Sequence, residues 1–128
     1  MDPIADMLNQ IKNAQMVSKE TVSLPFSNFK YELAQILEKN HFIEGTEKKG
    51  RGVKRILEIG LKYQGGEPLI SDFKKISRPG QRIFLPAKKI KSTKKGRGMV
   101  VISTSRGLMS ALEAKRNKLG GEVICEIW

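Results

Sequence analysis

The sequence is poor in the side chains from which catalytic and metal sites are usually built. Its 128 residues include one cysteine, Cys125, and one histidine, His41. A single cysteine excludes a disulfide or a cysteine zinc cluster within one chain. A serine nucleophile normally needs a histidine base, and neither Ser103 nor Ser105 lies in a G-x-S-x-G motif. We therefore predict that the chain is not an enzyme and needs no metal or cofactor, although spacing alone leaves a serine–lysine hydrolase open as an alternative.

Long apolar runs and a basic leader are also missing. No run approaches the roughly 18 residues that a membrane span needs, and the N-terminal MDPIADM is acidic where a targeting peptide would be basic. With 39% hydrophobic residues, the chain still has enough apolar side chains for a modest core. We expect a compact protein that stays in the cytoplasm and does not contact a membrane.

Acidic residues become scarce in the second half of the chain. The whole sequence holds 24 Lys and Arg against 13 Asp and Glu, a net charge of +11. Residues 1–70 contain ten basic and nine acidic groups, whereas residues 71–128 contain fourteen and four. The natural partner of such a surface is a polyanion. The second half is therefore the expected binding half.

Hydrophobic periodicity predicts two helices and three strands in the first half. Pro3 suits the first turn of a helix, and Ser27 or Asn28 suits the cap of a second helix that ends near Asn40. The last strand alternates apolar and polar residues from Val53 onward and forms a hairpin with the strand before it. The expected elements are helices over 3–17 and 28–40 and strands over 21–26, 42–47 and 53–61.

Residues 63–68 are the best candidate for a linker. This segment contains two glycines and a proline, and it lies where the charge balance changes. We expect an α+β fold of two small modules. The N-terminal αβαββ module spans residues 1–64, and a mainly antiparallel β module with one short helix spans residues 69–128.

Turn and cap residues organise the second module. Pro79-Gly80 suits the two central positions of a type II turn. Ser110 and Glu113 have the spacing of a capping box, for a helix over 111–118 that Gly120 would end in the left-handed conformation. Strands are expected over 70–77, 82–85, 98–103 and 122–128, the second returning from the turn, with a basic connection over 86–98 and a loop over 103–109.

Lysine and arginine gather in the basic connection. A solvated loop would explain this run by itself. However, a small fold cannot distribute so many cations without forming a continuous positive face, to which phosphates bind by releasing condensed counterions. The candidate binding cations are Arg78, Arg82, Lys88, Lys89, Lys91, Lys94, Lys95 and Arg97.

The run Ser103, Thr104, Ser105, Arg106 and Gly107 combines three hydroxyls, a guanidinium and a flexible backbone. Hydroxyls donate and accept hydrogen bonds, and arginine forms paired hydrogen bonds with phosphate or guanine. Glycine lets the backbone approach a ligand closely. The run therefore suits folded RNA. A DNA-reading helix would be basic and an RNA-recognition motif rich in aromatics, and the sequence shows neither. Two alternatives stay open: a polar loop whose hydroxyls bond its own backbone, and a general nucleic-acid binder such as an RNA chaperone or a DNA architectural protein.

Four motifs together resemble the bacterial form of small-subunit ribosomal protein eight, a family of primary ribosomal RNA-binding proteins. They are DPIADML with IKNA near the N-terminus, ISRPG in the middle, ISTSRG, and GGEVICEIW at the end. The resemblance covers nearly the whole chain. It implies two α/β modules, of which the C-terminal one binds the central domain of small-subunit ribosomal RNA and helps to assemble the platform of the ribosome.

The resemblance also implies which residues bind RNA and which partners are near. Ser103, Thr104, Ser105 and Gly107 would lie against bases and backbone of an irregular internal loop in an RNA helix. Glu122, in the GGE motif, joins Arg106 and the cations above in the expected RNA-binding set. The N-terminal module would add backbone contacts and touch small-subunit proteins five and twelve. Repression of the family member's own operon messenger RNA is a further implied role, and no DNA partner is expected.

Three departures from the family pattern are present. Lys94-Lys95-Gly96-Arg97-Gly98 replaces an Asn-Gly turn, and SALEAK (110–115) replaces the usual helix opening. Where the family often has Tyr, this chain has Phe84, which removes a hydroxyl.

Overall fold

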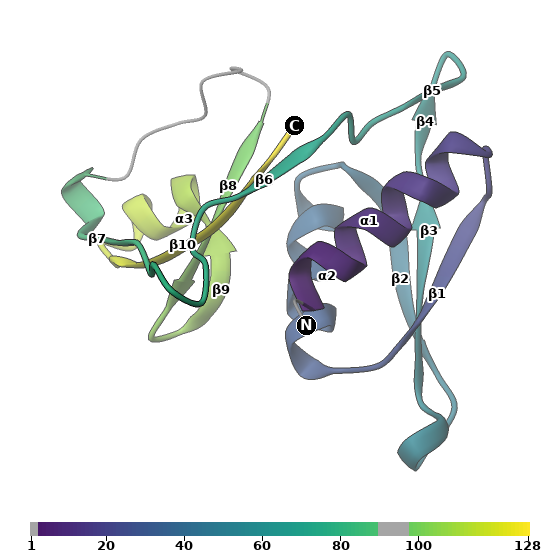
Figure 1. The fold of residues 1–128 in the computed structure, drawn as a ribbon, viewed down its shortest axis with the longest axis horizontal. Helices are drawn as coiled ribbons and strands as arrows, with labels where there is room; N and C mark the ends of the chain where they lie inside the picture. Colours follow the sequence, from purple (N-terminus) through teal and green to yellow (C-terminus); the bar gives the residue numbers. More distant parts are fainter. Residues whose placement is uncertain (1–2, 90–97) are drawn as a thin grey trace. The chain divides into compact units, whose positions relative to one another are not determined.

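The computed structural model describes residues 3–89 and 98–128 of the chain. Its helices and antiparallel sheets confirm the predicted α+β class. The chain divides between Ser71 and Asp72 into two compact units (Figure 1). Residues up to Ser71 are called the first unit here, and residues from Asp72 the second unit.

The first unit has the predicted αβαββ order. Its elements are α1 (Pro3–Met16), β1 (Thr21–Pro25), α2 (Asn28–Lys39), β2 (Ile43–Lys49) and β3 (Ile56–Leu61). β3 lies between β1 and β2 and is antiparallel to both. Leu57, Ile59 and Leu61 alternate along β3 and are buried. One face of this sheet therefore carries the core of the first unit, together with buried residues of both helices.

The start of α2 confirms that a serine caps it. The Ser27 hydroxyl accepts a hydrogen bond from the backbone N–H of Lys30 at 3.1 Å, so Ser27 rather than Asn28 is the cap. This bond satisfies one of the backbone donors that the first turn of a helix leaves unpaired.

The connection between β2 and β3 differs from the prediction. Residues 52–54 form a short 3₁₀ turn, η1 (Gly52–Lys54), instead of the beginning of a strand. Val53, predicted to alternate into the core, is fully exposed. The backbone N–H groups of Lys54 and Arg55 donate to Arg51 O and Gly52 O, which closes the turn. β3 therefore begins three residues later than expected, at the exposed Ile56, and its buried alternation begins at Leu57.

The predicted linker is a second hairpin. β4 (Tyr63–Gln64) and β5 (Glu67–Pro68) pair around a two-residue glycine turn. The Tyr63 hydroxyl donates to Lys19 O at 2.6 Å, and Gln15 Nε2 donates to Ile70 O at 2.9 Å. These bonds hold residues 63–70 to the first unit, so the division between the units falls later than the predicted linker.

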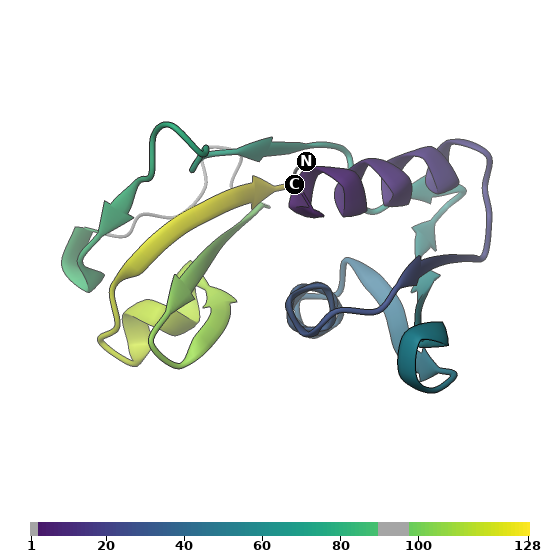
Figure 2. The same ribbon diagram turned by 60° about the horizontal axis from the view of Figure 1, so that its bottom comes forward.

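In the second unit, one long strand organises the sheet. The strands are β6 (Phe73–Lys75), β7 (Phe84–Leu85), β8 (Met99–Thr104), β9 (Gly107–Ser110) and β10 (Gly121–Ile127). β10 pairs with β8 along one side, and β8 pairs with β9. Both β6 and β7 pair with the other side of β10 (Figure 2). The strand at 98–103 and the strand at 122–128 are thus confirmed to within a residue or two at their ends.

The pairing of β7 corrects the prediction that it returns along β6. Ile76 N donates to Ile124 O, and Val123 N donates to Ile83 O, so β6 and β7 form one edge along β10. Residues 77–82 form a loop, called the excursion here, that connects the two strands of this edge. Backbone bonds between Arg78 and Gln81, in both directions, close the predicted Pro-Gly turn. Gly80 does not have a positive φ, so the turn is not type II.

The short helix α3 (Ala111–Arg116) begins as predicted and ends earlier. The Ser110 hydroxyl accepts from Glu113 N at 3.2 Å, which confirms its role as the cap. The residue in the left-handed conformation after the helix is Lys118, with φ of 57°, and not Gly120. Gly120 instead lies close to the backbone of Leu85.

One hydrophobic cluster of the second unit lies between α3 and one face of the sheet. Ala111 and Ala114 pack there against Ile102, Met109 and Val123. The side chain of Cys125 is fully buried. Of the predicted basic connection over 86–98, the structure describes Pro86, η2 (Ala87–Lys89) and Gly98. Among residues 3–89 and 98–128, no helix has the length and apolar character required to span a membrane.

Replacing Ser110 by alanine is expected to lower the free energy of unfolding by about 1 kcal/mol, because the Glu113 N–H loses its partner. Trp128, the single tryptophan, lies in the second unit, so its fluorescence during urea unfolding measures the effect. Ser105→Ala is a matched control, since Ser105 is exposed and lies outside the helix. Equal unfolding midpoints for both variants would contradict the capping role.

Candidate nucleic-acid interface

The hydroxyl-rich run forms the tip of a tight hairpin and not the predicted loop over 103–109. Ser103 and Thr104 end β8, and Gly107 begins β9. Thr104 pairs with Gly107, so only Ser105 and Arg106 form the turn. Gly107 has φ of 104°, a conformation that residues with a side chain rarely adopt. The run is therefore a defined protrusion of the sheet.

The hydroxyls of Thr104 and Ser105 at the hairpin tip have different surroundings. The Thr104 hydroxyl donates to Gly107 O at 2.9 Å and accepts from Arg106 N at 3.1 Å. For Thr104, the structure thus supports the alternative that the hydroxyl bonds its own backbone. Ser105 is exposed, and within the described part of the chain its side chain has no hydrogen-bond partner. Ser105 is the hydroxyl of the turn that is available to a ligand.

Cross-strand pairing extends this surface over the sheet. Ser103 lies opposite Leu108 on β9 and opposite Glu122 on β10, and Glu122 lies opposite Phe84 on β7. Directly paired residues present their side chains on the same face of a sheet. Ile102 precedes Ser103 and packs toward α3, so this row lies on the face opposite α3. Phe84 is 66% exposed, which places an aromatic side chain at the end of the row.

The site demands a glycine beside Glu122. A Cβ built on Gly121 would stand 2.1 Å from the backbone O of Ser103. The two strands that carry Ser103 and Glu122 can therefore approach this closely only because residue 121 has no side chain.

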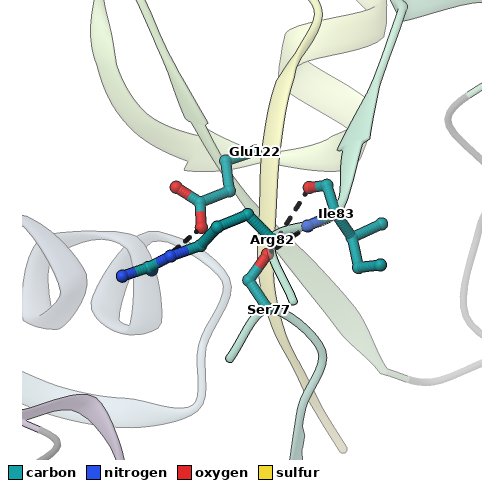
Figure 3. A network of polar contacts seen from close by, with 4 residues as sticks. All are labelled: Ser77, Arg82, Ile83 and Glu122. Atoms are coloured by element: carbon teal, nitrogen blue, oxygen red, sulfur yellow. Dashed lines mark hydrogen bonds and ion pairs between the residues drawn. The ribbon is translucent and has the colours of Figure 1, made fainter. Parts of the chain in front are cut away.

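Arg82 and Glu122 form an ion pair at the centre of this surface. The guanidinium Nη1 lies 3.2 Å from the Glu122 carboxylate, although the two residues are 40 positions apart in sequence (Figure 3). Ser77, which is buried, donates its hydroxyl hydrogen to Ile83 O and accepts from Ile83 N. These two hydrogen bonds between Ser77 and Ile83, called the Ser77 bracket here, hold the backbone next to Arg82.

Several other cations of the second unit have no acidic ion-pair partner among the described residues. Arg78 is exposed at the Pro-Gly turn, Lys88 and Lys89 are exposed on η2, and Arg106 is exposed at the hairpin tip. Among residues 3–89 and 98–128, none of these four has a carboxylate oxygen within ion-pair distance. Lys74, Lys75 and Arg78 also line a hollow of about 530 Å³.

Part of the predicted site falls outside the described residues. This part comprises Lys91, Lys94, Lys95 and Arg97. The described part brings together the hairpin tip, Glu122, Arg82 and Phe84.

Two features of this surface were missed by the sequence prediction. One is the bracket formed by Ser77, and the other is the direct pairing of Arg82 with Glu122. Neither has a local signal, because each joins residues whose spacing in sequence carries no helical or strand period.

Comparison with known proteins decides the family. The family model described as Ribosomal protein S8 matches residues 2–128. The chain belongs to the ribosomal protein S8 family. This confirms the resemblance that the four sequence motifs indicated, and ribosomal proteins are a structural, non-enzymatic class. As a family member, the chain is a protein of the small ribosomal subunit and is associated with the ribosome.

Curated relatives in the S8 family match over almost their full lengths. The small ribosomal subunit protein uS8 of Clostridioides difficile is 47% identical over 128 residues, which cover 99% of this chain and 97% of that protein. The uS8 protein of Bordetella petrii is 46% identical and that of Mycoplasmopsis pulmonis 44%. These matches cover 98% and 99% of this chain, and 96% of each relative.

Proposed function

We propose that the second unit binds the central domain of small-subunit ribosomal RNA and helps to assemble the platform. The observation that carries this proposal is the exposed Ser105-Arg106 turn, which projects from the sheet that carries Ser103, Glu122 and the exposed Phe84 on one face. An aromatic ring, hydroxyls and a carboxylate together suit unstacked bases and 2′-hydroxyls of an irregular RNA loop. A surface of phosphate-binding cations alone would not need them.

In this proposal the two kinds of residue have separate roles. The hairpin tip and the row beside it recognise the shape of the RNA loop, and Phe84 offers a face on which a base can stack. The uncompensated cations, among them Arg78, Lys88 and Lys89, supply affinity that does not depend on sequence. Lys91, Lys94, Lys95 and Arg97 belong to the cationic set by their place in the sequence.

Replacing Ser105 by alanine is expected to weaken binding to a central-domain RNA fragment about fivefold, because a hydroxyl with no partner among the residues that the structure describes loses its hydrogen bonds to RNA. Binding to a random RNA duplex should change less than about twofold. Titration of both RNAs by filter binding at physiological salt measures the two constants.

Lys88→Ala with Lys89→Ala is the matched comparison. This double variant should weaken binding to both RNAs. It should also reduce the slope of log affinity against log salt concentration by roughly 0.7 to 0.9 for each phosphate that is no longer neutralised. Equal losses for Ser105→Ala and the lysine variant on both RNAs would contradict the separation of roles. If unrelated RNA or DNA competes as strongly as the central-domain fragment, the protein is a general nucleic-acid binder.

Two further roles depend on the same proposal. A messenger RNA that presents a similar irregular loop would bind the same hairpin tip, so repression of the protein's own operon would use the ribosomal RNA surface. The first unit, whose charge is nearly balanced, would add backbone contacts and touch small-subunit proteins five and twelve. Competition between the operon leader and the central-domain fragment tests the first of these roles.

A further inference from the structure

A carboxylate at the centre of an RNA-binding surface requires an explanation. Glu122 lies on β10 between Ser103 and Phe84, in a unit that contains only four acidic residues against fourteen basic ones. An unpaired carboxylate would repel the phosphates that the surrounding cations attract. Only 19% of the Glu122 side chain is exposed, so its position is largely set by its neighbours.

The neighbour that sets it is Arg82. Its Nη1 donates to Glu122 Oε2 at 3.2 Å, and Figure 3 shows the second carboxylate oxygen turned away from the guanidinium. The backbone at Arg82 is itself fixed. Ser77 bonds both backbone groups of Ile83 at 3.0 and 3.4 Å, and Ile83 O also accepts from Val123 N at 2.8 Å on the central strand.

The excursion that carries Arg82 is closed at both ends. At its tip, Arg78 and Gln81 exchange backbone hydrogen bonds of 3.0 and 2.9 Å. At its base, the Ser77 bracket joins it to the edge of β10. Such a loop can hold a guanidinium in one place with little loss of side-chain entropy on binding.

We propose that Arg82 is a positioning residue for RNA recognition and not one of the phosphate-binding cations. By pairing with one carboxylate oxygen, it neutralises Glu122 and leaves the other oxygen as an acceptor next to Ser103. That oxygen accepts a hydrogen bond from an N–H or O–H donor of the RNA, which is either a base amino group or a 2′-hydroxyl. This inference rests on the proposed function, and it changes the role that the sequence assigned to Arg82.

The two roles of Arg82 predict different binding data. A phosphate contact contributes directly to the salt dependence and to random duplex binding, whereas a residue that acts through Glu122 affects them only through the charge left on Glu122. We therefore expect Arg82→Gln to weaken binding to the central-domain fragment three- to tenfold, with smaller changes in the salt slope and in duplex binding than Arg78→Gln causes. In a Glu122→Gln background the same substitution should change affinity less than about 1.5-fold, because the residue it positions has lost its charge.

Arg78→Gln is the matched control. Arg78 lies in the same excursion, is exposed, and has no ion-pair partner among the described residues. Its replacement removes the same charge as Arg82→Gln. It should lower the salt slope by roughly 0.7 to 0.9 and weaken binding to both RNAs. The unfolding midpoint of Arg82→Gln should stay within about 2 °C of the parent, because the Arg82 side of the ion pair is 54% exposed and a pair that is open to solvent contributes little to stability.

The donor is identified with modified RNA in the same titration. Deoxyribose at the loop nucleotides removes 2′-hydroxyls, and purine in place of adenine or inosine in place of guanine removes an amino group. Glu122→Gln should have no further effect on the RNA that lacks the true donor. If its effect persists on every modified RNA, the acceptor role of Glu122 is wrong.

Two other outcomes separate this inference from the proposed function. If Arg82→Gln lowers the salt slope as Arg78→Gln does, or costs the same in both Glu122 backgrounds, Arg82 is a phosphate contact and the inference fails while the proposed function stands. If the unmodified protein binds the central-domain fragment and random RNA equally, the proposed function fails, and the inference fails with it.

Discussion

Replacing Gly121 by alanine is expected to lower the free energy of unfolding of the second unit by roughly 3 to 5 kcal/mol, the largest stability effect that we predict. The added Cβ would stand 2.1 Å from Ser103 O and 2.9 Å from Ser103 C. Both atoms are backbone, so no side-chain rotation can relieve the overlap, and β10 must move away from β8. These are the two strands at the centre of the sheet.

The measurement is urea unfolding of the full chain followed by Trp128 fluorescence. Gly80→Ala is the matched control, because a Cβ on Gly80 would meet nothing within 4 Å and its φ is not positive. That variant should keep or slightly raise the midpoint, since alanine restricts the unfolded chain. A midpoint for Gly121→Ala equal to that of Gly80→Ala would show that the strands tolerate separation at Ser103.

The separation of these strands would also disturb the binding surface. Ser103 and Glu122 are direct cross-strand partners, and Gly121 precedes Glu122. Folded Gly121→Ala protein, stabilised by low temperature or osmolyte, should therefore bind the central-domain fragment more weakly than the parent. The glycine in the GGE motif thus supports both the fold and the proposed site.

Local signals predicted much of the fold. The alternation of Leu57, Ile59 and Leu61 defined β3, and the serines at positions 27 and 110 marked where α2 and α3 begin. Each of these features depends on neighbours within a few residues in sequence. The short turn at Val53 was missed because an apolar residue in register with a strand carries no sign that the chain turns there.

Pairing between distant segments could not be predicted in the same way. A return of residues 82–85 along β6 was the simplest local interpretation of a Pro-Gly turn. In the structure, β10 provides a longer partner, and β6 and β7 share its edge. The hydrogen bonds of β10 compete with those of a local hairpin, and β10 lies about forty residues further along the chain.

The composition of the candidate site was visible in the sequence, whereas its internal bonds were not. Charge balance separated the second half from the first, and the hydroxyl run identified the hairpin tip. Residue type alone assigned equal roles to Ser103, Thr104 and Ser105. In the structure, the Thr104 hydroxyl forms hydrogen bonds with backbone groups of Arg106 and Gly107. A hydroxyl's partner depends on the direction of its side chain in the folded strand, which residue type does not reveal.

Replacing Thr104 by valine is expected to weaken binding to the central-domain fragment by roughly 10- to 100-fold, the largest binding effect that we predict. Valine keeps the shape and branching of threonine but removes the hydroxyl. The Arg106 N–H then loses its acceptor and Gly107 O loses a donor, and each missing hydrogen bond costs about 1 kcal/mol. The turn that presents Ser105 would no longer hold a single conformation.

Thr104→Ser is the control that isolates this hydroxyl. Serine keeps both hydrogen bonds and removes only a methyl group, so its affinity for the fragment should stay within about threefold of the parent. Binding of either variant to a random duplex should change less than about twofold, since the exposed cations Arg78, Lys88 and Lys89 are untouched. Amide hydrogen exchange at Arg106 gives an independent readout. The Arg106 N–H, which donates to the Thr104 hydroxyl, should exchange faster in the valine variant and not in the serine variant. If serine weakens binding to the fragment while valine does not, and Arg106 exchange stays slow in both, Thr104 contacts RNA through its methyl group and does not act by holding the turn.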